Sequence, residues 1–234
     1  MKNLSTSVKI YIGVVAFLFA VKLVFLLFPT RFPLAEQESA FYWTTIVVIA
    51  LLGFVGLILS RKIGFPDIWD PRISVRQRFL LPIIIGLVYG LITVVRDLPN
   101  PSPVHLKLPL SIVFYTYGAV FLEIMLRLFA IPFLVWLISS LILRGRGRTA
   151  VFWLAVVIAA LYEPLPHISR ELGDVTPIAV PRILVNWIFQ PLFLANVASG
   201  WLLRKYGFLA PLTLRLAFYL VWHIFYGGLI STAA

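Results

Sequence analysis

The sequence predicts an all-α integral membrane protein, and two observations carry that prediction. Hydrophobic residues make up 61% of the 234 residues and charged residues only 12%, about half the share typical of a soluble domain. The apolar residues form long runs close to the ~20 residues that cross a bilayer as a helix, and the short alternating segments of a membrane β-barrel are absent. We therefore expect one polytopic bundle that forms a single integral membrane domain over residues 1–234.

Seven apolar runs are candidate membrane spans, and the fourth of them is much longer than the others. As a straight helix the fourth run would measure about 54 Å, whereas the hydrocarbon core of a bilayer is about 30 Å thick. It must therefore tilt, break near Pro132 or cross the membrane twice. The seven runs cover residues 10–28, 41–60, 79–95, 108–143, 149–162, 180–203 and 207–230.

The distribution of Lys and Arg favours a single crossing by the fourth run. With one crossing, twelve of these bases lie on the side of the N-terminus and five on the other side. A second crossing would move five of the twelve to the poorer side. Because basic loops stay in the cytoplasm, we expect about seven spans in the cell membrane and a cytoplasmic N-terminus. The net charge of +11 then reflects orientation rather than nucleic-acid binding, and the basic, aromatic loop 61–78 fits contact with membrane lipids.

Two charges lie inside the fourth run, Glu123 and Arg127. An ionised side chain at the bilayer centre costs roughly 2.5–3.5 kcal/mol or more. The spacing of four residues places both side chains on one helix face, where each lowers the cost of the other. One interpretation is an ion pair that locks neighbouring helices together. The other is a catalytic carboxylate, Glu123, which Arg127 orients as a general base.

The last two runs carry further polar side chains. Arg215, Tyr219 and His223 recur every four residues, which places them in one stripe along the last run. Such a stripe avoids lipid and faces the interior of the bundle. Asn186 and Gln190 are also four residues apart and are expected to face the same interior, either in interhelical hydrogen bonds or as part of a polar cavity.

A histidine beyond the fifth run completes the candidate residues. His167 follows Glu163 and two prolines, which stop the fifth helix, and it is either a surface residue or a ligand or general acid at the membrane boundary. The chain has no cysteine and three histidines, and it shows no compact metal-ligand spacing. We therefore predict no cofactor. A divalent metal site formed by Glu123, His167 and His223 stays an alternative, although the spacing of these residues in the sequence does not support it.

The order of these groups is typical of one protein family. A long span with Glu-x-x-x-Arg is followed by a helix that ends near a histidine, and then by Gly-Phe-Leu-Ala-Pro-Leu before the polar stripe. This order resembles the CPBP family of intramembrane proteases, which includes type II CAAX prenyl endopeptidases and bacteriocin-processing (Abi) proteins. The resemblance covers about half of the chain and implies a CPBP-like core at residues 108–230.

The first two motifs of the family match in part. In Glu-Glu-x-x-x-Arg, Glu123 and Arg127 take the second Glu and the Arg. Leu122 takes the place of the first Glu, which is the water-activating carboxylate of the family. In Phe-x-x-x-His, His167 takes the histidine, and Glu163 stands where Phe is expected.

The third motif, His-x-x-x-Asn or His-x-x-x-Asp after Ala-Pro, departs further. Aligned on Ala210-Pro211, it puts Arg215 at the histidine and Tyr219 at the Asn or Asp. His223 lies one helical repeat later, where some members carry an additional histidine. Arg215 could still stabilise an oxyanion, or it could pair with the carboxylate of the first motif and close the cavity to chemistry.

The resemblance implies an intramembrane endopeptidase that cleaves membrane-associated or prenylated peptides. In that enzyme Glu123 or His167 would activate water, and Arg215 or His223 would stabilise the oxyanion. The missing motif residues leave a second interpretation open, a catalytically inactive relative that binds a peptide or lipid in the same cavity. A third is a transporter with Glu123 as its proton-coupling group, although the chain lacks the paired broken helices typical of transporters.

Overall fold

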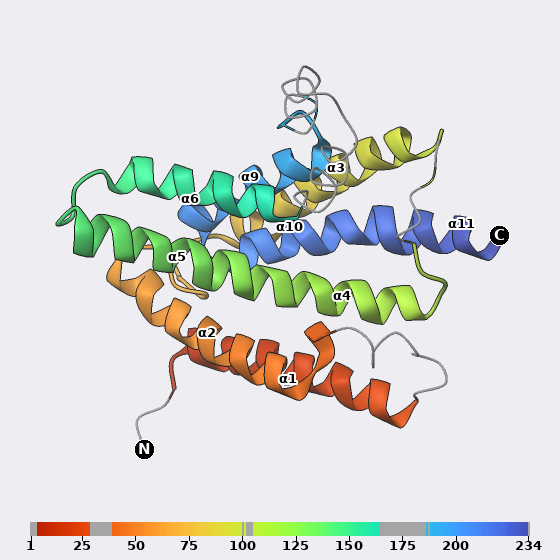
Figure 1. The fold of residues 1–234 in the computed structure, drawn as a ribbon, viewed down its shortest axis with the longest axis horizontal. Coiled ribbons are helices and arrows are strands. Elements are labelled where there is room, and N and C mark those ends of the chain that lie inside the picture. The colour runs from red at the N-terminus through yellow and green to blue at the C-terminus, as the bar shows by residue number, and fades with distance from the viewer. Residues whose placement is uncertain are drawn as a thin grey trace, which may run out of the picture.

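The computed structural model describes residues 4–28, 39–99, 101, 105–163, 186 and 188–233. Every regular element among them is helical, which confirms the predicted class (Figure 1). The elements are α1 (Thr6–Leu27), η3 (Ser39–Phe41), α2 (Trp43–Lys62), η4 (Arg76–Leu80), α3 (Leu81–Asp97), α4 (Leu110–Glu123), η5 (Ile124–Ala130), α5 (Ile131–Leu134), η6 (Val135–Ile142), α6 (Arg148–Tyr162), α9 (Pro191–Tyr206), α10 (Leu209–Tyr219), η8 (Leu220–Tyr226) and α11 (Gly227–Ala233).

Five helical segments are long and apolar enough to cross a membrane, which identifies an integral membrane protein. They are Thr6–Leu27, Trp43–Lys62, Arg76–Asp97, Leu110–Ile142 and Leu209–Ser231. The fifth predicted span corresponds to the shorter helix α6, and the sixth is described from α9 onward. The total of seven crossings and the cytoplasmic N-terminus stay predictions.

The long fourth run forms one continuous helical segment, Leu110–Ile142, and does not reverse at Pro132. Two wide π-helical stretches, η5 and η6, lie on either side of the short α5 that holds this proline. Proline removes a backbone donor, and local π-helical turns are one way in which a membrane helix accommodates that loss. A helical hairpin at Pro132 is therefore excluded, whereas the single crossing that the charge distribution favours stays a prediction.

The long segment lies in the middle of the bundle, with α1 and α2 on one side and α6, α9, α10 and α3 on the other (Figure 1). Close approach on the first side depends on Gly56 of α2, where an added Cβ would run into the backbone of Leu128. On the other side, a Cβ at Gly86 of α3 would run into the backbone of Leu214 in α10. Small residues at such positions are typical of packed membrane helices.

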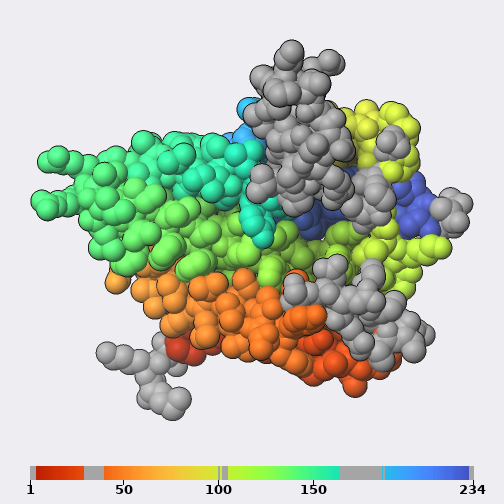
Figure 2. Space-filling model, viewed as in Figure 1, coloured from red at the N-terminus to blue at the C-terminus, as the bar shows by residue number. Residues whose placement is uncertain are grey.

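The basic loops of the chain meet at one end of the bundle. Arg148 at the start of α6 donates a hydrogen bond from Nη1 to the carbonyl of Ile63, 3.1 Å away. Arg204 at the end of α9 donates from Nη2 to Thr149 Oγ1 at 3.0 Å. The turn between η6 and α6 projects farthest at this end (Figure 2). The grouping of bases that underlies the predicted orientation is therefore present in the fold.

The loop after α2 is held by its own ion pairs. Arg72 binds Asp70 through Nε at 3.0 Å and through Nη2 at 2.6 Å, and these hydrogen bonds lower the pKa of Asp70 to about 2. The buried guanidinium of Arg78 lies 3.9 Å from the centre of the Trp69 ring and donates to the carbonyl of Asp70 at 2.6 Å. These contacts give the loop a defined shape.

Candidate functional site

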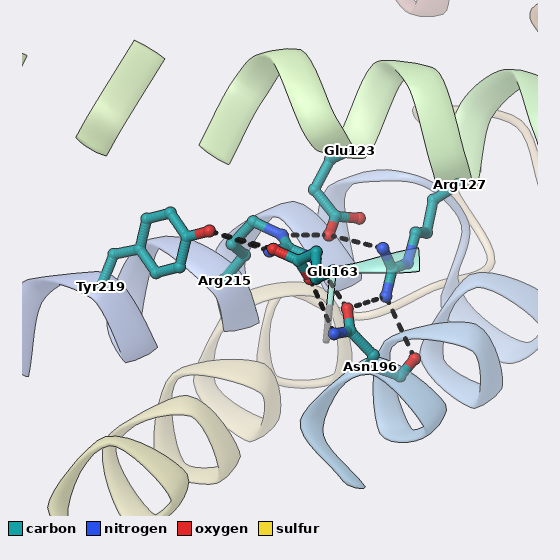
Figure 3. Close-up of polar contacts among 6 residues, drawn as sticks. All are labelled: Glu123, Arg127, Glu163, Asn196, Arg215 and Tyr219. Atoms are coloured by element: carbon teal, nitrogen blue, oxygen red, sulfur yellow. Dashed lines mark hydrogen bonds and ion pairs between the residues drawn. The ribbon is translucent and has the colours of Figure 1, made fainter. Parts of the chain in front are cut away.

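Six polar side chains meet in the interior of the bundle, contributed by four parts of the chain (Figure 3). They come from the central helix, from the position directly after α6, from α9 and from α10. Burial is nearly complete, since Glu123 and Arg127 have no exposed surface and Asn196 is 2% exposed. We call this set the polar cluster, and its members are Glu123, Arg127, Glu163, Asn196, Arg215 and Tyr219.

Arg215 is the centre of the polar cluster. Its Nε donates to Glu123 Oε1 at 2.6 Å, and its Nη1 donates to Glu163 Oε1 at 2.6 Å. Its Nη2 donates to Asn196 Oδ1 at 2.7 Å, and Nη1 also lies 3.1 Å from the Tyr219 hydroxyl. All three nitrogens of the guanidinium therefore have an acceptor, and these contacts use four of its five N–H donors.

Arg127 makes looser contacts on the other side of the same carboxylate. Its Nη1 lies 3.6 Å from Glu123 Oε1, an ion pair longer than a hydrogen bond. Its Nη2 donates to both oxygens of Asn196, with 3.2 Å to the backbone carbonyl. Asn196 in turn donates from Nδ2 to Glu163 Oε2 at 2.7 Å. The amide of Asn196 thus joins both arginines to the second carboxylate.

The charges of the polar cluster balance. Two carboxylates, Glu123 and Glu163, face two guanidinium groups, Arg127 and Arg215, within hydrogen-bond or ion-pair distance. Removal of four ions from water is expensive, and close, hydrogen-bonded partners are what offset that cost. The balance explains how four ionised groups persist in the interior of a membrane bundle.

The backbone of the central helix presents Glu123 to the cluster. Glu123 is the last residue of α4, and the π-helical stretch η5 begins at the next residue. Leu122, one residue and about 100° away around the helix, is partly exposed, whereas Glu123 is fully buried. The inward position therefore belongs to Glu123 and not to Leu122. Such π-helical turns are frequent at functional sites.

The structure brings together most of the residues that the sequence singled out. Five of the six cluster residues were candidates; His167 lies outside the described residues. The expectation that Asn186 faces the interior is not met, because its side chain is exposed. Gln190 is partly buried directly before α9, and no hydrogen bond between described residues joins it to the polar cluster.

His223 lies beyond Tyr219 along the same stripe. Its ring stacks on Tyr115 with centroids 4.0 Å apart, and it meets the Tyr219 ring edge-on at 4.9 Å. Its Nδ1 is buried without a hydrogen-bond partner among the described residues. His223 therefore packs with aromatic rings, and no ion pair or hydrogen bond within the described part links it to Glu123.

Asn196 is the cluster residue that sequence reasoning missed. It lies on the face of α9 that also carries Ser199 and Gly200, and a Cβ at Gly200 would collide with Val156 of α6. Small residues three and four positions later mark that face as the packed one. This pattern would have identified Asn196 as an inward amide.

A narrow recess reaches the polar cluster between α9 and α10. Its volume is about 10 Å³, room for roughly one water molecule. Neither carboxylate lines it, and a peptide would need these helices to separate. Its lining residues are Leu192, Ala195, Asn196, Ser199, Leu214, Arg215 and Phe218.

Comparison with known proteins adds no relative to this picture. No protein-family model matches the chain, and neither a curated protein nor a solved structure matches it. Among the described residues, no group of three or more His, Cys, Asp or Glu side chains could hold a metal ion. What the polar cluster does must therefore be argued from its own geometry.

Proposed function

We propose that this chain is a non-hydrolytic relative of the CPBP intramembrane proteases that binds a membrane-resident peptide or lipid beside its polar cluster. The ion pairs of Arg215 with both carboxylates, Glu123 and Glu163, carry the proposal. Glu123 Oε1 accepts from Arg215 at 2.6 Å and lies 3.6 Å from Arg127. This oxygen is therefore held between two guanidinium groups and is not free to contact a water molecule or a substrate.

The recess between α9 and α10 supports binding rather than hydrolysis. Each helix offers it one polar and one apolar side chain, Asn196 and Leu192 from α9 and Arg215 and Phe218 from α10. A ligand that arrives from the bilayer would place a hydrogen-bonding group against the polar pair and apolar atoms against the apolar pair. Movement of α9 against α10 would open the space for it, since only about one water fits in the closed state.

A second candidate, hydrolysis by Glu123, has one observation in its favour. Glu123 Oε2 is buried and has no hydrogen-bond partner among the described residues. A water molecule at that oxygen would stand where a general base could take its proton. This candidate and the first make opposite predictions for cleavage.

Peptide cleavage separates the two candidates. Purified full-length protein in lipid nanodiscs is given a mixed peptide library and a farnesylated peptide, and the products are read by mass spectrometry. We expect the same background with the natural chain and with Glu123→Gln. Cleavage that the natural chain shows and Glu123→Gln loses would overturn the proposal and establish the endopeptidase.

Binding is tested with a photoreactive farnesylated peptide cross-linked in the same nanodiscs. Leu192→Trp narrows the mouth of the recess and should lower cross-linking several-fold. Leu194→Trp is the matched control, because Leu194 lies on the same helix but is exposed. Equal cross-linking in both variants, or none with the natural chain, would remove the recess as a binding site.

A further inference from the structure

An apolar groove runs along the outer face of η4 and α3 and begins at a cationic side chain. Its first part is lined by Arg76, Gln77, Leu80, Leu81 and Ile84. Through Ile84 it continues into a wider part of about 420 Å³, a volume in the range of small-molecule sites. The wider part is lined by Ile84, Ile85, Val88, Tyr89 and Ile92 of α3 and by Ala198 of α9.

The packing of α3 explains why this groove exists. Gly86 and Gly90 turn toward α10 and η8, where an added Cβ would collide with Leu214 and Val221. The opposite face of α3 therefore carries its large side chains outward, and Ile84 and Val88 are each about half exposed. The side chains of α3 form one side of the groove and α9 forms the other, and the small side chain of Ala198 leaves the bottom of the groove unfilled.

The charged end of the groove lacks a carboxylate. In the same region Arg61 pairs with Asp67 at 2.7 Å, and Arg72 pairs with Asp70 at 2.6 Å. Arg76 is exposed, and its guanidinium takes part in none of the ion pairs between described residues. The cationic end is therefore available to an anion from outside the chain.

A second cation lies on α9, the helix that contributes Ala198 to the groove. The ammonium of Lys205 lies 5.0 Å from the ring of Trp201, and Trp201 packs in the same apolar cluster as Leu81 and Ile85 of α3. Tryptophan and lysine at a helix end are typical of the headgroup level of a bilayer. Lys205 thus adds a positive charge on α9, next to a tryptophan that packs in one cluster with Leu81 and Ile85 of the groove.

The length of the groove fits one leaflet. From Arg76 to Ile92 the helix rises about 24 Å at 1.5 Å per residue. Half of the hydrocarbon core is about 15 Å, and one headgroup layer adds about 6 Å. A molecule that fills the groove therefore has a charged head and an apolar tail as long as those of a lipid in a single leaflet.

We propose that this groove is a binding site for one anionic diacyl phospholipid. The phosphate lies against Arg76, whose planar guanidinium can bind two phosphate oxygens at once, and Lys205 adds a second positive charge. One acyl chain lies between α3 and α9 as far as Ile92. The site is separate from the polar cluster and does not depend on what that cluster does.

Native mass spectrometry of the full-length protein tests the charged end. The protein is released from nanodiscs that hold equal amounts of dioleoyl phosphatidylglycerol and dioleoyl phosphatidylcholine, and the ratio of retained lipids is measured. We expect the natural chain to retain the anionic lipid, and Arg76→Gln to lower the ratio about fivefold, which corresponds to ~1 kcal/mol for one base at the membrane surface.

Arg144→Gln is the matched control, because it removes the same charge from the turn between η6 and α6 and should leave the ratio unchanged. Ala198→Phe fills the floor of the groove and should lower retention of both lipids, whereas Leu194→Phe on the same helix should not. The proposal is overturned if the natural chain retains both lipids equally. Equal effects of Arg76→Gln and Arg144→Gln would also overturn it, as would unchanged retention in Ala198→Phe.

Discussion

We expect replacement of Arg215 by glutamine to destabilise the protein more than removal of any other single charge apart from that of Arg127. Arg215→Gln removes the hydrogen bonds at 2.6 Å to Glu123 and Glu163 and changes the formal charge of the polar cluster from zero to −1. Loss of one partner from a buried ion pair typically costs about 3–5 kcal/mol, because the other charge stays buried without compensation. For a chain of this length, 1 kcal/mol corresponds to roughly 2–4 °C in Tm.

The assay is thermal unfolding of the detergent-solubilised protein, with Arg72→Gln as the matched control. Arg72 also binds a carboxylate at 2.6 Å, but its side chain is 86% exposed, and exposed pairs contribute about 1 kcal/mol or less. We expect Tm to fall by about 6–20 °C in Arg215→Gln and by a few degrees in Arg72→Gln.

A double substitution separates charge balance from lost packing. Glu163→Gln together with Arg215→Gln returns the polar cluster to formal neutrality, so the pair should be more stable than Arg215→Gln alone. Coupling energies of neighbouring charged residues are about 0.5–3 kcal/mol. If the double variant is no more stable than the single one, or if Arg215→Gln behaves like Arg72→Gln, the charge-balance argument fails.

Two other regions give simple stability predictions. The pKa of Asp70 is lowered from 3.8 to about 2 by Arg72, so its contribution to the free energy of unfolding is full above pH 4 and is lost as pH falls toward 2; in a pH series of denaturation curves, Asp70→Asn should remove that part of the decline. In denaturant titrations, Gly56→Ala should destabilise by about 1–3 kcal/mol through overpacking against Leu128. Gly13→Ala, where the added Cβ meets nothing within 4 Å, should be neutral or stabilising, and the reverse order would contradict the packing argument.

The fold class followed from the sequence because the bilayer imposes it. Apolar runs of this length have few alternatives to helices, and each of the five long helices overlaps one of the predicted runs, although four of them extend past a predicted end by one to four residues. The continuity of the segment around Pro132 was left open, because the distribution of bases bears on the number of crossings and not on a break within the helix. The π-helical stretches η5 and η6 could not be predicted. Their backbone hydrogen bonds join residues five positions apart, and over so few residues this changes the spacing of apolar side chains too little to be recognised in the sequence.

The charged residues of the polar cluster could be predicted from the sequence, whereas its neutral amide, Asn196, could not. In an apolar interior Glu123 and Arg215 each need a partner of opposite charge, and they form an ion pair with each other. The amides on the sixth run carried no such constraint, so Asn186 and Asn196 were equivalent by composition. Asn186 is exposed, whereas Asn196 is only 2% exposed. This difference depends on where α9 begins and on which of its faces meets α6.

The four charged residues of the polar cluster also depend on one another in physical terms. A bundle with Glu123, Arg127 and Arg215 but no further acid would carry a net positive charge in its interior. Glu163 supplies the missing negative charge at 2.6 Å from Arg215. Either Arg215 or Glu163 without the other would be costly, whereas the two together are neutral. The polar cluster is therefore one mutually compensated arrangement, in which no charge can be changed independently of the others.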